Sequence, residues 1–253
     1  MPPAKKRTRS YDPARTRAAV LAQFAHVRDA VRTLTPEQSA RPTRLGDRTV
    51  HELAVHLALT VDAVARAVAE PAPPAAELTL LEWPFAPAPD WERAAGQDLS
   101  TLYEEVAARA EAAAPPARLV STSYGAMSLG DFLVTRTVEL CVHTDDLNAA
   151  VPGLSVPYDR QALAACTRLL ADALAAKAPG GSVEVRIPPY AVVQCVAGPK
   201  HTRGTPPNVV ETDPLTWLRL ATGRESWSEA RDAGALAASG ERADVSALLP
   251  LRG

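Results

Sequence analysis

The sequence is short of the residue types that would place it in a simple functional class. Its 253 residues contain three cysteines, Cys141, Cys166 and Cys195, which are odd in number and widely spaced. This pattern excludes a disulfide framework and a CxxC metal knuckle, and such isolated thiols are usually small buried hydrophobes. We therefore expect a reduced, cytoplasmic protein. No apolar run approaches the roughly 18 residues of a membrane-spanning helix, so we expect no membrane span.

An excess of one charge is also missing. The chain has 27 basic and 29 acidic residues, which gives a net charge of −2. Nucleic-acid binding depends on clustered Lys and Arg that neutralise phosphates, so we expect no nucleic-acid partner. Only residues 1–10 are strongly basic. Because no apolar core follows them, we expect a disordered tail there and not a secretory signal.

The remaining composition favours helices. Aromatic residues make up 5% of the chain, whereas 47% is hydrophobic and rich in alanine. Residues 11–152 hold four helical patterns with recognisable starts, such as Asp12-Pro13, Thr49 with Glu52 three residues later, and Ser128. These patterns predict an N-terminal four-helix bundle, a fold in which metal sites form between facing helices. The predicted helices cover about residues 13–34, 49–68, 97–113 and 128–150.

The pattern changes in residues 153–253, where a smaller α+β domain is predicted. A helix is expected over about residues 160–177. The segments SVEVRI and YAVVQCV alternate apolar and polar residues and are rich in β-branched side chains, as strands are. Further along, NVVET is extended, LTWLRLAT is helical, a short helix lies near residues 227–233, ALAASG is a possible strand and DVSALLPL ends in a helical turn. The whole chain is thus an α+β protein of two domains.

The segment TVELCVHTDDL carries the most chemical information. It places Glu139 and His143 four residues apart in a helical pattern, so both side chains project from the same helix face. His56 lies on the apolar stripe of another predicted bundle helix. Two imidazoles and one carboxylate match the three-ligand set of a catalytic zinc-type site. Asp146, three residues after His143, tends toward the same face and is a candidate to orient an imidazole.

Each of these residues also has a purely structural interpretation. A histidine on an apolar stripe is often a core or rim residue, and a Glu–His pair at this spacing is often a surface contact. Asp146 is equally well explained as solvation of a helix end. In favour of the metal, Glu139 lies between Val138 and Leu140 in an apolar stretch, where a carboxylate without a partner would be costly to bury. The residues alone leave both interpretations open.

Two motifs resemble a known family. LGDRTVHELAVHL and, later, ELCVHTDDL resemble the LGDxTVxELxxHL and ExxxHxxDL motifs of the mycothiol-dependent maleylpyruvate isomerase family, a branch of the DinB-like metal proteins. ETDPLTWLRLATGR and the residues after it are similar to the sterol-carrier-like domain that accompanies that bundle. The resemblance therefore covers nearly the whole chain.

The resemblance implies a ligand set and shows one departure. In the family, residues at the positions of His56, Glu139 and His143 bind a divalent metal, usually zinc. The family usually carries Trp where this sequence has Arg48. That position precedes the metal helix, so we expect a change in packing or in the shape of the entrance, with metal binding retained.

The resemblance also implies thiol chemistry with mycothiol as cosubstrate, either isomerisation or thiol transfer on a small electrophile. Carboxylated substrates would need cationic partners, and the loop GPKHTRGT offers Arg203 and Lys200, with His201 as an acid–base candidate. All three are more simply explained as ordinary surface residues. Asp146 and Lys200 are the candidates for contacts with the cofactor or cosubstrate.

Two alternatives to catalysis follow from the same features. A sterol-carrier-like domain can bind a lipid or another small molecule without turnover, and the residues that would line such a tunnel are Val192, Val193, Trp217, Leu218 and Leu220. The same residues are more simply a domain core. Alternatively, the metal stabilises a scaffold that has no activity. Neither the substrate nor the oligomeric state can be derived from the sequence.

Overall fold

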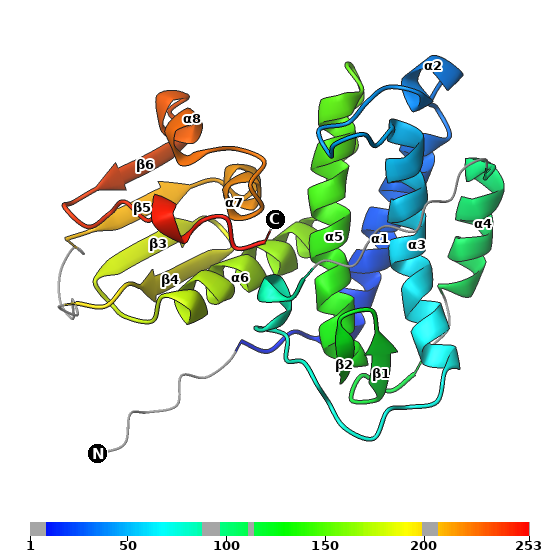
Figure 1. Cartoon of the computed structure of the whole chain (residues 1–253), viewed down its shortest axis with the longest axis horizontal. Coiled ribbons are helices and arrows are strands. Elements are labelled where there is room, and N and C mark those ends of the chain that lie inside the picture. The colour runs from blue at the N-terminus through cyan, green and yellow to red at the C-terminus, as the bar shows by residue number, and fades with distance from the viewer. Residues whose placement is uncertain (1–8, 88–96, 111–113, 199–206, 253) are drawn as a thin grey trace.

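The computed structural model describes residues 9–87, 97–110, 114–198 and 207–252. Its N-terminal part is a four-helix bundle (Figure 1). The bundle helices are α1 (Pro13–Val31), α3 (Val50–Ala69), α4 (Leu99–Arg109) and α5 (Leu129–Ala150). α5 packs against both α1 and α3, and α4 packs against α3. The predicted α+β class and the N-terminal bundle are confirmed.

The helix starts follow the side-chain caps that the sequence predicts. Asp12 accepts a hydrogen bond from the backbone N–H of Arg15, with Pro13 in the first turn. Thr49 and Glu52 form a reciprocal capping box, and Ser128 accepts from Asp131. Such caps satisfy the unpaired N–H groups of the first turn and contribute about 1 kcal/mol each. α4 is shorter than predicted, beginning after Asp98 and ending at Arg109.

A short antiparallel hairpin before α5 was not predicted. It consists of β1 (Leu119–Thr122) and β2 (Gly125–Ser128), with Val120 opposite Met127. Both of these side chains are fully buried, so the hairpin is stabilised by packing against the bundle more than by strand pattern. Gly125 has φ of 119° in the turn, a value that glycine adopts without strain. Two other short elements are α2 (Pro36–Ser39) and η1 (Trp83–Phe85).

The C-terminal part is a four-stranded sheet with helices. The strands are β3 (Val183–Ile187), β4 (Ala191–Cys195), β5 (Val209–Thr212) and β6 (Leu236–Ser239), in the order β4-β3-β5-β6. β3 and β5 are parallel, whereas the two outer pairings are antiparallel. The helical elements are α6 (Arg160–Lys177), α7 (Pro214–Ala221), α8 (Trp227–Asp232) and η2 (Ser246–Leu248).

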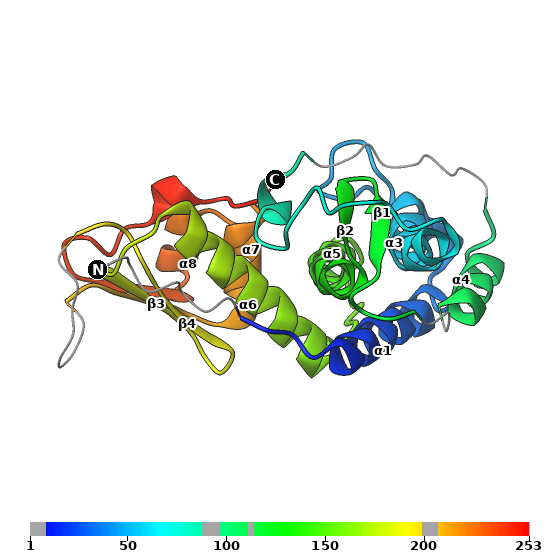
Figure 2. The same cartoon turned by 90° about the horizontal axis from the view of Figure 1, so that it is seen from below.

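Helix α6 joins the two parts. It packs on β4 and α7 at one side and on α1 and α5 at the other, and Figure 2 shows it crossing from the sheet toward α1. As a result α5 is enclosed almost completely, and its residues from Leu129 to Leu147 are largely buried. The described residues include no helix that is long and apolar enough to cross a membrane.

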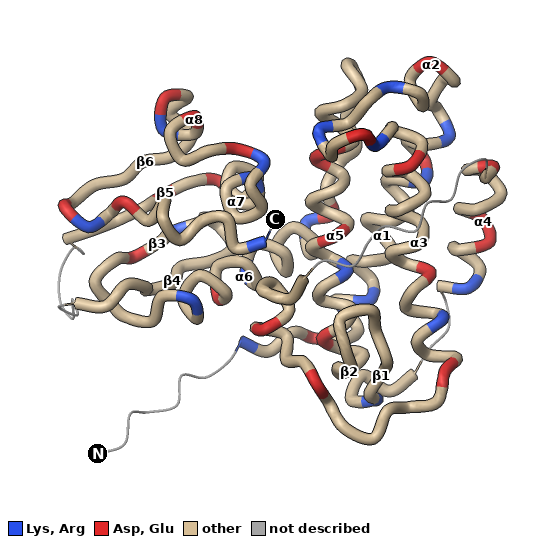
Figure 3. The backbone as a smooth tube through the Cα atoms, in the orientation of Figure 1, with Lys and Arg blue, Asp and Glu red and all other residues tan. Residues whose placement is uncertain are grey.

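Ion pairs also connect the two parts. Acidic positions of α5 and basic positions around α7 lie on facing sides (Figure 3). Arg219 of α7 holds Asp145 of α5 with two hydrogen bonds, of 2.6 and 3.0 Å, and Arg44 from the bundle pairs with the same carboxylate. The Asp145 side chain is 3% exposed, while the two arginines are about one third exposed.

We expect Asp145→Asn to lower the free energy of unfolding by about 1–3 kcal/mol, the range for charge-assisted hydrogen bonds. The loss stays moderate because both arginines can regain water. Urea denaturation followed by circular dichroism measures it. Asp29→Asn is the control, because its pair with Arg28 is exposed and should contribute less than about 1 kcal/mol. Equal losses in the two variants would contradict the role of Asp145.

Candidate metal centre

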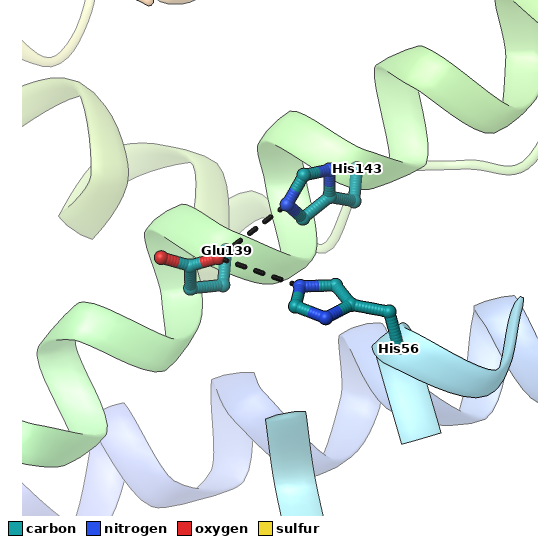
Figure 4. Close-up of side chains that lie close together, drawn as sticks. All are labelled: His56, Glu139 and His143. Carbon is teal, nitrogen blue, oxygen red and sulfur yellow. Dashed lines mark ion pairs between the residues drawn. The ribbon is translucent and has the colours of Figure 1, made fainter. Parts of the chain in front are cut away.

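Two histidines and a glutamate converge where α3 and α5 face each other (Figure 4). His56 comes from α3, and Glu139 and His143 come from α5. One nitrogen of each imidazole and one carboxylate oxygen all lie within 4.8 Å of one another. Oε2 of Glu139 is 3.8 Å from Nε2 of His56 and 3.4 Å from Nε2 of His143.

The local sequence explains how this group forms. Glu139 and His143 are one helical turn apart on α5, so their side chains point the same way. The apolar stripe of α3, with Leu53 and Leu57 fully buried, turns the neighbouring His56 toward α5. The two imidazole rings meet edge to face, with centroids 4.9 Å apart.

The pKa directions of His56 and Glu139 suit metal ligands, whereas that of His143 favours a bound proton. Burial lowers the pKa of His56 to about 4, so this imidazole is neutral near pH 7. Burial alone would raise the pKa of Glu139, but the facing imidazoles of His143 and His56 and the charge of Arg136 outweigh it and hold this pKa well below its ordinary value. Burial opposes charge on His143, yet hydrogen bonds to Asp146 and Glu139 raise its pKa. A cation and a proton would therefore compete for His143.

Asp146 orients one of the imidazoles. Its Oδ2 lies 2.9 Å from Nδ1 of His143, which leaves Nε2 of His143 facing Glu139. Asp146 is fully buried and is itself held by Arg44 at 2.6 Å and Arg224 at 3.1 Å. A carboxylate behind a histidine fixes its tautomer and raises its basicity, a common arrangement behind metal ligands. The structure thus places Asp146 behind His143 and not among the three converging groups.

The two oxygens of Glu139 have different partners. Oε2 faces the histidines, whereas Oε1 lies 3.3 Å from Nη2 of Arg252 and 3.5 Å from the hydroxyl of Tyr124. Arg252 also donates to the Tyr124 hydroxyl at 2.7 Å and stacks over the ring of Trp83, 4.2 Å from its centroid. Tyr124 comes from the turn of the hairpin and Arg252 from the C-terminal part, so both parts of the chain hold this carboxylate.

The three groups lie in the wall of a cavity of about 700 Å³. Two imidazole nitrogens and one carboxylate oxygen form the donor set of a divalent cation such as zinc, and the adjoining cavity leaves room for a further ligand. The residues present therefore fit the metal that the sequence pattern suggests. The cavity wall is rich in arginine, namely Arg48, Arg66, Arg136, Arg224 and Arg252.

Most of these arginines were not predicted as site residues from the sequence. The residues that were predicted, Lys200, His201 and Arg203, lie outside the described residues. Arg136 could have been predicted by the helix spacing that placed Glu139 and His143 on one face, because it precedes Glu139 by three positions on the same helix. Arg48, the departure from the family pattern, borders the cavity. No sequence pattern near Arg224 or Arg252 indicates that they belong to the site, because they reach it only through the packing of the second domain.

The residues proposed for a lipid tunnel have ordinary packing roles. Trp217, Leu218 and Leu220 are buried in the core of the C-terminal part. Val193 is buried too, while its neighbour Val192 is 58% exposed on the opposite face of β4. These positions do not form one common lining, so they give the lipid-binding alternative no support.

Comparison with known proteins agrees with the family and the fold. The family model described as "Mycothiol maleylpyruvate isomerase N-terminal domain" matches residues 20–148. The chain belongs to the mycothiol maleylpyruvate isomerase family. A second family model, described as "Bacterial SCP ortholog", matches residues 159–251. The family and the sterol-carrier-like C-terminal part predicted from the sequence are thereby confirmed.

Solved structures show the same fold. The chain is similar to a mycothiol-dependent maleylpyruvate isomerase, with a TM-score of 0.59 and 14% identity over 93% of this chain and 95% of that one. A mutant of such an isomerase matches with a TM-score of 0.57 at the same identity and coverage. No curated protein sequence matches the chain. At this identity the structures establish the shared two-domain fold of the family.

Asp146 gives a pH-dependent test of the arrangement. Burial would raise its pKa, but the hydrogen bond and charge of His143, followed by Arg224, bring it below its ordinary value. A carboxylate with a depressed pKa stabilises the fold fully above its unfolded pKa of about 3.9, and the contribution is lost as the pH falls toward the folded value.

We therefore expect Asp146→Asn to cost about 3–5 kcal/mol of unfolding free energy at pH 7, the range for breaking a buried ion pair. The difference from the wild type should shrink below about pH 4, where Asp146 takes up a proton, and should also decrease above about pH 6.5, where His143 loses the proton that Asp146 stabilises. Denaturation at a series of pH values measures it. A difference that does not change down to pH 2 would contradict the assigned partners.

Proposed function

We propose that this protein is a divalent-metal-dependent enzyme that uses mycothiol for isomerisation or thiol transfer on a small electrophile. The observation that carries the proposal is the convergence of His56, Glu139 and His143 in the wall of a cavity of about 700 Å³. Membership of the mycothiol maleylpyruvate isomerase family supplies the thiol and the reaction class.

The three converging residues would hold the metal, with zinc the expected ion. A bound divalent cation lowers the pKa of a coordinated thiol and so supplies a thiolate at neutral pH. Glu139 remains ionised because His143, His56 and Arg136 favour its charged form. His56 stays neutral and offers a nitrogen lone pair. Asp146 holds the proton of His143 on Nδ1, so that Nε2 is available.

The cavity wall supports a carboxylated electrophile. Guanidinium groups match carboxylates through paired hydrogen bonds, and arginines from both parts of the chain border the cavity. In an isomerisation, thiolate would add to a conjugated double bond, rotation would follow about the new single bond, and elimination would release the thiol and the trans product. A thiol transfer would use the addition and omit the elimination.

The proposal predicts about one equivalent of divalent metal per chain after reconstitution and dialysis. His56→Ala and Glu139→Ala should bind less than about a tenth of that amount, because each removes one of three ligands. His26→Ala is the matched control, since His26 lies on α1 and is not among the cavity-lining residues. Elemental analysis gives the stoichiometry. A wild-type protein without metal after exposure to excess zinc would refute the site.

Thiol-dependent turnover tests the chemistry. Maleylpyruvate and a panel of other unsaturated acids would be incubated with the metal-loaded protein, with and without mycothiol. Turnover should require both the metal and the thiol, and His143→Ala should lower kcat/KM by at least about 100-fold, as loss of a ligand does. Conversion followed by chromatography separates isomerised acids from thiol adducts. Equal rates without thiol would contradict the proposed reaction class.

A further inference from the structure

The arginines of the cavity wall differ in how many hydrogen bonds and ion pairs they already make with the protein. Arg224 and Arg252, from the C-terminal part, hold Asp146 and Glu139 at 3.1 and 3.3 Å. Arg224 donates another hydrogen bond, of 2.7 Å, to the backbone oxygen of Thr222. These two guanidinium groups act as supports for the site, because their donors are bound to its acidic residues and backbone.

Two further arginines on the wall have acidic neighbours on their own helix. Arg66 pairs with Asp62 at 3.2 Å, one turn away on α3. Arg48, just before α3, lies 3.9 Å from Glu52. Each of these two arginines therefore has a carboxylate within 4.0 Å.

Arg136 differs from these four. It is only 5% exposed and stacks over the ring of Phe132, 4.5 Å from the centroid. Its Nε donates to the Thr135 hydroxyl at 3.1 Å, and its buried Nη2 has no hydrogen-bond partner among the described residues. The charge of Glu139 and the hydroxyl of Tyr124 act on Arg136, but no ion pair within 4.0 Å joins Arg136 to a carboxylate in the described chain.

A buried cation in this state is costly. An unpaired buried donor costs about 1–3 kcal/mol, and removing a charged group from water costs more unless an opposite charge is close. Unsatisfied donors of this kind are uncommon in folded proteins and are often found at sites that bind something. Arg136 borders the same cavity as the three converging residues, so an anion entering the cavity would lie close to its positive charge.

We propose that Arg136 is the receptor for a carboxylate of the ligand and selects small carboxylic acids over neutral electrophiles. The inference rests on the proposed function for the identity of the reacting partner. Arg136 precedes Glu139 by three residues, which is a rise of roughly 4.5 Å along α5. A carboxylate held by Arg136 therefore leaves the rest of a short-chain acid, a few bonds long, beside His56 and His143.

The alternative is that Arg136 serves only the packing of α5 through its contact with Phe132. The two roles predict opposite effects on stability. Loss of a packing residue lowers the melting temperature, whereas replacing a buried, incompletely paired cation by a neutral side chain is neutral or stabilising. Arg136→Gln and Arg136→Met separate these outcomes without any measurement of turnover.

Binding of succinate is the test, because succinate is a four-carbon dicarboxylate without a double bond and cannot react with a thiol. Calorimetric titration of the metal-loaded and of the chelator-treated protein, with succinamide as the neutral comparison, isolates the contribution of the charge. Arg136→Gln should raise the Kd for succinate about 10- to 100-fold in both the metal-loaded and the chelator-treated protein. Arg136→Lys should recover part of the lost affinity. Succinamide should bind poorly to the wild type and to both variants. The melting temperature of Arg136→Gln should not fall.

The control is Arg15→Gln, an exposed arginine on α1 that is not among the cavity-lining residues, and it should leave the Kd unchanged. An unchanged Kd in Arg136→Gln, no binding of succinate by the wild type, or a lower melting temperature without a change in Kd would overturn the inference. Succinate binding that depends on Arg136 in a protein without thiol-dependent turnover would refute the proposed function alone. Turnover with an unchanged KM for carboxylated electrophiles in Arg136→Gln would refute the inference alone.

Discussion

The burial of charged side chains on α5 is the constraint on which the site depends. This helix is enclosed by the bundle, by α6 and by the C-terminal part, yet its buried face carries Arg136, Glu139, His143, Asp145 and Asp146. A buried charge is tolerated only with opposite charges and hydrogen bonds around it. The neighbouring segments therefore supply hydrogen-bond and ion-pair partners to these side chains. His56 of α3, which faces Glu139 and His143, is one of them.

The second domain is consequently part of the site. Arg252 holds the outer oxygen of Glu139, and Arg224 holds Asp146 behind His143. Because both arginines come from the C-terminal part, the orientation of the candidate ligands depends on how the domains pack. This dependence gives a physical reason for the two family domains to occur in one chain. Arg136, which belongs to α5 itself, keeps a buried Nη2 that has no hydrogen-bond partner among the described residues.

The sequence was sufficient for the features that arise from local rules. Helix caps at Asp12, Thr49 and Ser128 set the helix starts, and the four-residue spacing of Glu139 and His143 placed both on one face. The hairpin at residues 119–128 escaped detection because its strands are four residues long and depend on burial of Val120 and Met127.

The partners of α5 that come from distant segments could not be predicted from the sequence. Arg252 and Tyr124 are 113 and 15 residues from Glu139, and no local pattern records that they meet its carboxylate. Their role depends on the packing of the domains and of the hairpin. Arg136 could have been selected by its helix position, but its incomplete pairing is visible only once the burial of α5 is known.

In the proposed site, two imidazoles and one carboxylate hold a metal with a position left for a thiol. X-ray absorption at the zinc edge of the reconstituted protein tests it most directly. We expect nitrogen and oxygen neighbours at about 2.0–2.2 Å with the scattering of two imidazoles, and a new sulfur neighbour at about 2.3 Å when mycothiol is added. A shell of four imidazoles, or one that does not change with thiol, would contradict it.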